Sequence, residues 1–392
     1  MLSLASLSRP SPAVALIFVF LVTTFTFRGQ ISRGVNESLN SLRISDEVIS
    51  ERLIPETPER WRFISKSVPI NHAKQRTLLL TLTNDLSSWG RMEVNYKRNW
   101  SFTDYIERVR KQGMDPEELS LGLLTSSKEA LESYKNDLLR LKEPMPWSEA
   151  EIIYLPDLPL PFERWNHTRD NRYNTDAEKQ WQRRRYIARF RNYLTSTTLK
   201  PRYEHMIWLD ADVFELPNGM FKRFLEIGST NPEKEEDDIT PLVKAGLAAD
   251  TQALPAGLVT LRSVNFDHPD YDRNAWTGYG KRPTNWELAQ MTTKGRQYPG
   301  METWAKALSQ LLPGTKDDDL VKLDSVGGTA LYIRAALVRE GLVFPQYLVV
   351  GTEWGKAGRD GVETEGLCYI AERMGWGCYA LGGDWHTVHS DL

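Results

Sequence analysis

Apolar residues occur along this chain as short runs that alternate with stretches in which they recur every three or four positions. The first run, residues 77–83, is followed by the turn-forming pair Asn84-Asp85 and predicts a buried strand. Similar runs predict strands at residues 119–125, 151–154, 257–262, 329–333 and 378–381. Helical periodicity predicts helices near residues 103–111, 126–141, 176–195, 221–227, 302–311 and 365–374. This alternation is typical of an α/β fold with a mostly parallel central sheet flanked by helices.

One further apolar run, residues 206–209, differs because two carboxylates, Asp210 and Asp212, follow it directly. In extended backbone, side chains two residues apart point to the same side. Both carboxylates can therefore face one point beyond the strand end, where α/β sheets commonly bind ligands. Two oxygen ligands suit Mg2+ or Mn2+, which would also hold phosphate oxygens. The alternative is a surface turn, where Asp is common; we adopt the metal interpretation because Asp-x-Asp is typical of nucleotide-sugar glycosyltransferases.

The N-terminal region contains a membrane-anchor candidate at residues 13–28, of which residues 13–27 are all apolar or Thr. A cleaved signal peptide is the alternative, but no small-residue cleavage site follows Phe27. We therefore predict a single-pass type II protein with a cytoplasmic tail, residues 1–12, a stem, residues 29–72, and a lumenal catalytic domain, residues 73–392. Sequons downstream of the anchor support this orientation, at Asn36, Asn99 and Asn166.

The amino-acid composition excludes few classes of protein, but it narrows the choice of binding partners. The chain has 49 Lys and Arg against 52 Asp and Glu, a net charge of −3, which does not favour nucleic acid as a partner. Cys368 and Cys378 are the only cysteines, so the sequence holds no cysteine cluster for a metal. Whether these two pair or remain free thiols is left open.

The predicted helix at residues 176–195 is rich in arginine. Arg184 and Arg191 lie along the edge of its apolar stripe, whereas Arg185 and Arg189 fall on the opposite side, where a solvated face is expected. An arginine at the border of the core can pack its stem and direct its guanidinium into a cleft, and the planar fork suits a diphosphate. Contact with a donor phosphate and structural ion pairing are the two alternatives for Arg184 and Arg191.

Two histidines stand near the C-terminus, in a segment after the last predicted strand that would otherwise be free to fray. Octahedral Mn2+ has positions left after two aspartates and two phosphate oxygens, and an imidazole can fill one of them. The residues alone do not decide between His386 and His389.

Several stretches of the chain carry the signature of one family. They are the helix from Arg183-Arg184-Arg185 to Arg191-Asn192, Asp210-Ala211-Asp212, Tyr271-Asp272-Arg273-Asn274-Ala275-Trp276, and, in the C-terminal third, Leu323-Asp324-Ser325-Val326-Gly327-Gly328, Glu363-Thr364-Glu365-Gly366 and His389. Together they resemble the fungal Golgi α-mannosyltransferases of mannan polymerase complexes, glycosyltransferase family 62, over most of residues 77–389.

The resemblance implies a GT-A fold, GDP-mannose as donor, Mn2+ (or Mg2+) as metal, retention of the α configuration, and work on N-glycan outer chains in the Golgi within a hetero-oligomeric complex. It selects His389 as a third metal ligand beside Asp210 and Asp212. It also implies donor-binding roles for Thr83, Arg184, Arg191 and Asp324, and catalytic roles, such as binding acceptor hydroxyls, for Glu363 and Glu365. For these two glutamates, carboxylates that complement a helix N-terminus are the alternative.

Three other functions remain in competition. Phosphatases of the haloacid dehalogenase type also use Asp-x-Asp after a strand, but normally on the first strand of the domain, which disfavours them here. A non-catalytic scaffold subunit would keep the fold without turning over donor. A glycosyltransferase with a different sugar nucleotide would share the metal site and differ in the surrounding pocket.

Overall fold

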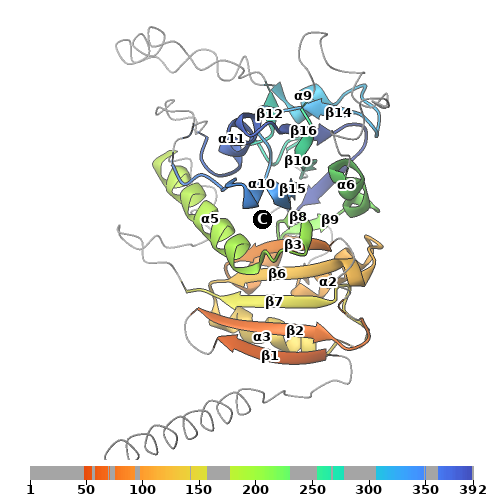
Figure 1. Cartoon of the computed structure of the whole chain (residues 1–392), viewed down its shortest axis with the longest axis vertical. Coiled ribbons are helices and arrows are strands. Elements are labelled where there is room, and N and C mark those ends of the chain that lie inside the picture. The colour runs from red at the N-terminus through yellow and green to blue at the C-terminus, as the bar shows by residue number, and fades with distance from the viewer. Residues whose placement is uncertain are drawn as a thin grey trace, which may run out of the picture.

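The computed structural model describes residues 48–156, 177–229, 254–277, 306–347, 349 and 361–390, with gaps at residues 55–57, 69, 71–75, 93–97, 142 and 266–267. Its centre is a ten-stranded sheet that extends along the long axis of the molecule (Figure 1). The strands lie in the order β1 (Val48–Ile54), β2 (Glu59–Ser65), β7 (Glu149–Tyr154), β6 (Leu119–Thr125), β3 (Arg76–Thr83), β8 (Tyr203–Leu209), β15 (Ala330–Arg334), β10 (Ala256–Thr260), β16 (Gly377–Leu381) and β14 (Leu320–Lys322).

The direction of the strands differs from the prediction. Strands β7, β6, β3 and β8 are adjacent and parallel, and β10 is parallel to β16. The other five neighbouring pairs are antiparallel. The sheet is therefore mixed, and the predicted mostly parallel sheet is wrong outside this parallel centre. An apolar run shows that a strand is buried, but buried parallel and antiparallel strands have the same run. The hydrophobic pattern alone therefore could not decide the direction of each strand.

The first two strands come from the predicted stem, residues 29–72. β1 pairs with β2, and β2 pairs with β7, so residues 48–65 belong to the central sheet. The prediction that the folded domain begins near residue 73 is wrong for this segment. Along β2, charged residues alternate with apolar ones, and Arg62 forms an ion pair with Glu149 of β7 at 2.7 Å. Glu149 is distant from β2 in sequence. The local pattern therefore shows only that the segment is polar and does not reveal that it pairs with another strand.

Helices cover both faces of the sheet (Figure 1). Neighbouring strand residues alternate between the faces, as Leu78 and Leu79 show by belonging to different core clusters. The cluster of Leu79 includes side chains of α2 (Phe102–Arg110), α3 (Lys128–Leu139) and α6 (Met220–Ser229). The cluster of Leu78 includes side chains of α5 (Ala177–Thr198), α9 (Leu308–Leu311), α10 (Ala335–Arg339) and α11 (Leu367–Arg373). The predicted α/β fold with a large sheet between helices is confirmed.

Helix predictions differ from the structure mainly at the ends. The helix predicted at residues 365–374 is shorter, because a 3-10 turn, η5 (Glu363–Gly366), precedes α11. Of the helix predicted at residues 302–311, residues 306–311 are described: α9 confirms its last turn, whereas residues 306–307 form a strand, so the predicted helix is wrong there. Two more 3-10 turns occur in the N-terminal half, η1 (Leu86–Trp89) and η2 (Pro116–Glu118).

The C-terminal segment is a strand rather than a tail. β17 (His386–His389) lies between β11 (Arg262–Val264) and β9 (Val213–Glu215) in a three-stranded sheet. It is parallel to β11 and antiparallel to β9. The sequence alone gave no sign of this strand, because its hydrogen-bonding partners are remote in sequence. Two small sheets complete the fold, β4 (Arg91–Met92) with β5 (Arg98–Asn99) and β12 (Trp276–Thr277) with β13 (Lys306–Ala307).

Among the described residues, no helix is both long enough and apolar enough to cross a membrane. The predicted anchor at residues 13–28 lies outside the described residues, as do the sequons at Asn36 and Asn166.

Candidate metal and donor site

The two carboxylates after β8 lie on a tight turn rather than on extended backbone. β8 ends at Leu209, and residues 211–212 turn the chain before β9 begins. The amide N–H of Asp210 donates to the carbonyl of Thr329 at 2.9 Å, which fixes the turn to the start of β15. The turn still brings the carboxylates together, because ligand atoms of Asp210, Asp212 and His389 all lie within 4.8 Å of one another.

His389 approaches this pair from β17. Its Nε2 lies 2.9 Å from Oδ1 of Asp212, and the residue is 1% exposed. The amide N–H of Ser390 donates to the carbonyl of Asp212 at 2.9 Å, which closes the strand onto the turn. His386 is exposed, and its Nδ1 faces the carbonyl of Asp384 at 2.7 Å. The structure therefore brings His389, and not His386, to the acidic pair.

The charge balance of this cluster favours a bound cation. The pKa of Asp210 is raised to about 7, first by burial and then by the like charges of Asp212 and Asp272, while Arg191 and His389 oppose the rise. The Asp210 side chain keeps 39% of its surface exposed, so water offsets part of the burial effect. The like charge of Asp212 has a smaller effect on this pKa than the opposing charge of Arg191. The geometry is the stronger argument, because a divalent cation would relieve the repulsion between the two close carboxylates.

Arg191 of α5 is the cation nearest to the acidic pair. Its Nη2 lies 3.3 Å from Oδ1 of Asp210 and donates to the carbonyl of Gly328 at 3.2 Å. The guanidinium carbon is 5.1 Å from the ring centre of Trp208 and 5.2 Å from that of Phe344. These rings fix the guanidinium plane. A Cβ on Gly328 would lie 2.7 Å from Nη2, so glycine is needed for this close approach.

The predicted catalytic glutamates lie opposite the arginines. Oε1 of Glu363 is 3.4 Å from Nε of Arg191, and Oε2 of Glu365 is 2.8 Å from Nη1 of Arg184. All four residues are buried. Glu363 has a φ of 62°, a left-handed conformation that no other non-glycine residue adopts among the described residues. Such strain is often kept at functional sites, and here it holds a carboxylate against Arg191.

Three further site predictions have different outcomes. Arg185 was expected on a solvated face, but it is half-buried and its Nε donates to the carbonyl of Gln346 at 2.8 Å. The hydroxyl of Thr83 donates to the carbonyl of Leu124 at 3.2 Å, and Asp324 accepts from the hydroxyl of Thr277 at 3.2 Å. These bonds tie Thr83 and Asp324 to neighbouring segments, and donor contact for either stays a prediction.

Asp272 is a residue whose role the sequence did not indicate. Its Oδ2 accepts from the amide N–H of Gly328 at 2.6 Å and from the N–H and hydroxyl of Thr329, each at 3.1 Å. The carbonyls of the same two residues accept from the amide N–H of Asp210 and from the guanidinium of Arg191. The adjacent glycines were the available signal, because both are buried and a buried backbone N–H needs an acceptor.

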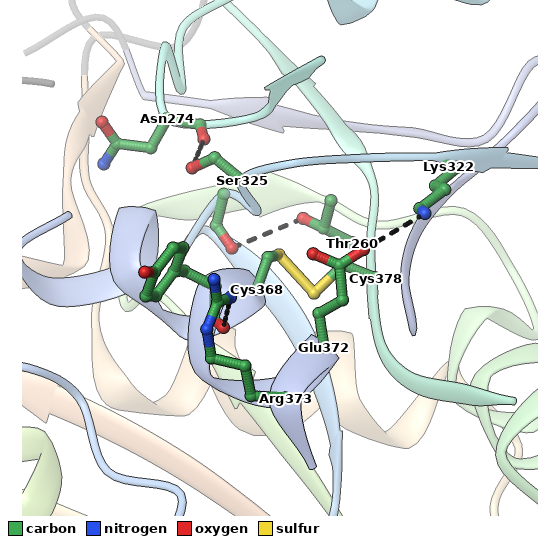
Figure 2. The surroundings of a disulfide bond; sticks show 10 residues. Thr260, Asn274, Lys322, Ser325, Cys368, Glu372, Arg373 and Cys378 are labelled. Carbon is green, nitrogen blue, oxygen red and sulfur yellow. Dashed lines mark hydrogen bonds and ion pairs between the residues drawn. A yellow bond between two sulfur atoms is a disulfide. The ribbon is translucent and has the colours of Figure 1, made fainter. Parts of the chain in front are cut away.

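A disulfide joins Cys368 of α11 to Cys378 of β16, with a Cα–Cα distance of 5.7 Å (Figure 2). Nearby, Lys322 of β14 pairs with Glu372 of α11 at 3.4 Å. Helix α11, which follows the two glutamates, is thus tied covalently to the central sheet. The sequence left open whether the two cysteines pair, and in the structure they do.

An α/β sheet that ends in an acidic pair, with a histidine and a buried arginine beside it, is typical of proteins that bind a divalent metal together with a phosphorylated ligand. Comparison with known families is more specific. The model of the Anp1 family matches residues 65–348. The chain belongs to the Anp1 family, and the resemblance to fungal mannan polymerase proteins is confirmed.

Similar relatives carry names from the same group. The chain is 26% identical to the mannan polymerase complex subunit mnn9 of Schizosaccharomyces pombe, over 54% of this chain and 52% of that protein. It is 25% identical to MNN9 of Candida albicans, over 81% and 80%, and 28% identical to the VAN1 subunit of mannan polymerase I of Saccharomyces cerevisiae, over 51% and 32%. The match thus spans about half the length of the Schizosaccharomyces relative.

Among solved structures, the mannosyltransferase PcManGT from Pyrobaculum calidifontis, in complex with GDP-Man and Mn2+, is similar over 83% of this chain and 60% of that chain, with a TM-score of 0.38 and 10% identity. An overlap of this size carries no argument about the site.

Proposed function

We propose that this chain is a metal-dependent, retaining α-mannosyltransferase of GT-A type that uses GDP-mannose to extend N-glycan outer-chain mannan or a related glycan. It acts within a hetero-oligomeric complex of related subunits. The observation that carries the proposal is the cluster of Asp210, Asp212 and His389 with Arg191 beside it. Membership of the Anp1 family and the names of the relatives support the sugar and the complex.

The residues of this cluster fit a divalent metal. Two carboxylates and one imidazole provide hard oxygen and nitrogen ligands, and their ligand atoms all lie within 4.8 Å of one another. Asp210, Asp212 and His389 would hold Mn2+ or Mg2+, which when bound supplies Lewis-acid stabilisation of a diphosphate leaving group.

Arg191 provides the fixed positive charge that the reaction needs. When the bond between the anomeric carbon and the diphosphate breaks, negative charge grows on the leaving phosphate. Arg191 is oriented in advance by Glu363, Gly328 and two aromatic rings, so it can stabilise this charge without reorganising. In a retaining reaction the acceptor hydroxyl attacks on the leaving-group side, and a phosphate oxygen can take its proton. No side chain is then required as a base.

The ion pairs suggest a specific role for the two glutamates. Glu363 and Glu365 hold Arg191 and Arg184 in place from η5, and contact of these carboxylates with the acceptor stays a prediction. Arg184 lies about two helical turns before Arg191 on α5 and would bind the diphosphate only if the donor extends toward Glu365.

The test is hydrolysis and transfer of GDP-mannose by the purified chain with Mn2+. Asp212→Asn should remove most metal-dependent turnover and keep the fold. Asp318→Asn is a matched control, because Asp318 lies in another loop and its side chain is 73% exposed. Turnover by Asp212→Asn at the wild-type rate would contradict the metal site.

A non-catalytic scaffold subunit is the second candidate. Each site arginine already has a buried carboxylate partner, so neither arginine needs a donor phosphate to balance its charge, and the arrangement could persist in a protein that transfers no sugar. A scaffold would bind Mn2+ and GDP without turning over GDP-mannose. The same assay with a panel of other sugar nucleotides separates the two cases: a scaffold would turn over none of them, whereas an enzyme with a different donor would turn over one.

For location, we propose a type II Golgi membrane protein with its catalytic domain in the lumen. The disulfide supports this, because disulfides persist in oxidising compartments. Asn99 of the sequons is exposed on β5 and accessible to glycosylation. Glycosidase treatment of protein from a eukaryotic host should lower its apparent mass. Full protease access to unglycosylated protein in intact vesicles would reverse the orientation.

A further inference from the structure

The ring of Tyr271 lies flat against the imidazole of His389. The ring centres are 3.8 Å apart and the planes differ by 21°. Tyr271 belongs to the loop after β11, whereas His389 is the last residue of β17. The tyrosine therefore covers one face of the imidazole whose edge points to Asp212.

His389 lacks a strong hydrogen bond on its second ring nitrogen. A histidine that binds a metal is normally oriented by a bond from its other nitrogen to a carboxylate, carbonyl or water. Here Nδ1 faces the carbonyl of Ser390, the next residue in the chain, at 3.3 Å. That separation is longer than the 2.7–3.2 Å typical of a good hydrogen bond, by about 0.1 Å or more. The stack on Tyr271 is the stronger restraint on the ring plane.

The position of Tyr271 is fixed by its backbone rather than by the stack. Its amide N–H donates to the carbonyl of Ser263 in β11 at 2.8 Å. β11 runs parallel to β17, with Ser263 beside Thr387, so the loop folds back over the strand that carries His389. On its other side, Asp272 is anchored to the turn at Gly328 and Thr329. The tyrosine ring is thus presented to the imidazole by two independent attachments.

We infer that Tyr271 is a positioning residue for the metal site: its ring fixes the imidazole plane of His389 so that Nε2 faces a divalent cation held with Asp210 and Asp212. The inference rests on the proposed function, since it requires His389 to be a metal ligand. Stacking needs the flat ring and not the phenolic hydroxyl, which makes the role separable by substitution.

The experiment measures Mn2+ binding by the purified full-length chain without donor, from the electron paramagnetic resonance signal of free Mn2+. Tyr271→Leu, which keeps apolar bulk without a flat ring, should raise the dissociation constant roughly 10-fold or more, the scale for residues that orient metal ligands. Tyr271→Phe should stay within about twofold of the wild type. Tyr271→Ala serves as a second variant, and thermal unfolding confirms that each protein is folded.

Two results would overturn the inference. Wild-type affinity in both Tyr271→Leu and Tyr271→Ala would mean that the stack does not orient His389. Equal loss in Tyr271→Phe and Tyr271→Leu would mean that the hydroxyl, not the ring, matters.

His389→Ala separates this inference from the proposed function. If that variant binds Mn2+ as the wild type does, the metal site itself is wrong, and the role of Tyr271 with it. If it binds weakly while Tyr271→Leu does not, only the role of Tyr271 is wrong.

Discussion

Arg191 and Glu363 form a buried ion pair, with Nε of the arginine 3.4 Å from Oε1 of the glutamate. The same guanidinium also reaches Asp210 at 3.3 Å. One arginine therefore joins helix α5, the acidic turn after β8 and the 3-10 turn η5. Removing one partner of a buried pair leaves the other charge uncompensated, which makes this contact a sensitive point of the site.

Arg191→Ala should weaken GDP binding about 10- to 100-fold, since a charge-assisted hydrogen bond contributes about 1.5–3 kcal/mol. The measurement is isothermal titration of GDP in the presence of Mn2+. Arg189→Ala is the control, because Arg189 lies on the same helix and is half-buried. Equal losses in both variants would mean that only the general positive charge of α5 matters.

The strain at Glu363 can be separated from its charge. Glu363→Gln and Glu363→Gly both remove the negative charge, but only glycine adopts a φ of 62° without steric cost. The left-handed conformation costs other residues about 1–2 kcal/mol, and glycine loses about 0.5–1 kcal/mol through the entropy of the unfolded chain. Glycine should therefore be the more stable variant by roughly 0.5–1 kcal/mol in urea unfolding. If Glu363→Gln were more stable than Glu363→Gly, the backbone of η5 would have moved out of the left-handed conformation in the glutamine variant.

Loss of the disulfide should lower stability without removing the fold. Cys378→Ser opens a short loop, for which the chain-entropy model gives about 2–3 kcal/mol. Cys368→Ser should have a similar effect, and the double variant should add little to either. Denaturant unfolding measures the difference. A wild-type protein whose melting temperature is unchanged by a reducing agent would contradict a stabilising role.

Stability should also fall in mild acid because of His205. This residue is 3% exposed and its Nδ1 lies 2.9 Å from the hydroxyl of Tyr332. Burial, with a smaller effect of Arg334, lowers the pKa of His205 from 6.5 to about 4. Between these values the unfolded chain binds more protons than the folded one, so stability is lost as pH falls from about 6.5 to about 4. The loss attributable to this group is at most about 3 kcal/mol.

His205→Asn should flatten that part of the pH profile. The comparison uses unfolding free energies of wild type and variant at several pH values in this window. Identical slopes in the two proteins would assign the acid sensitivity to other groups.

Sequence patterns located the parts of the fold whose signal is local. Buried parallel strands such as β3 and β6 are continuous apolar runs, and the helix α3 has an apolar stripe at helical spacing. The pair Asp210 and Asp212 was visible because two carboxylates directly follow such a run. The choice of His389 over His386 needed the family resemblance, since the residues alone left both open.

Tertiary structure decided everything that depends on partners distant in the chain. β2 appears polar in sequence, but Arg60 and Arg62 are balanced by two glutamates of β7 across the sheet. The direction of β15 and the burial of β17 depend on their neighbours rather than on their own composition. Arg184 and Arg191 of α5 pair with buried carboxylates of η5, and the imidazole of His389 stacks on the ring of Tyr271. The sequence by itself determined which residues are buried in strands and helices and where acidic ligands stand, because both follow from local hydrophobic pattern. Only the folded chain decided which charges meet and how each ring is held, because those are long-range contacts that no local pattern encodes.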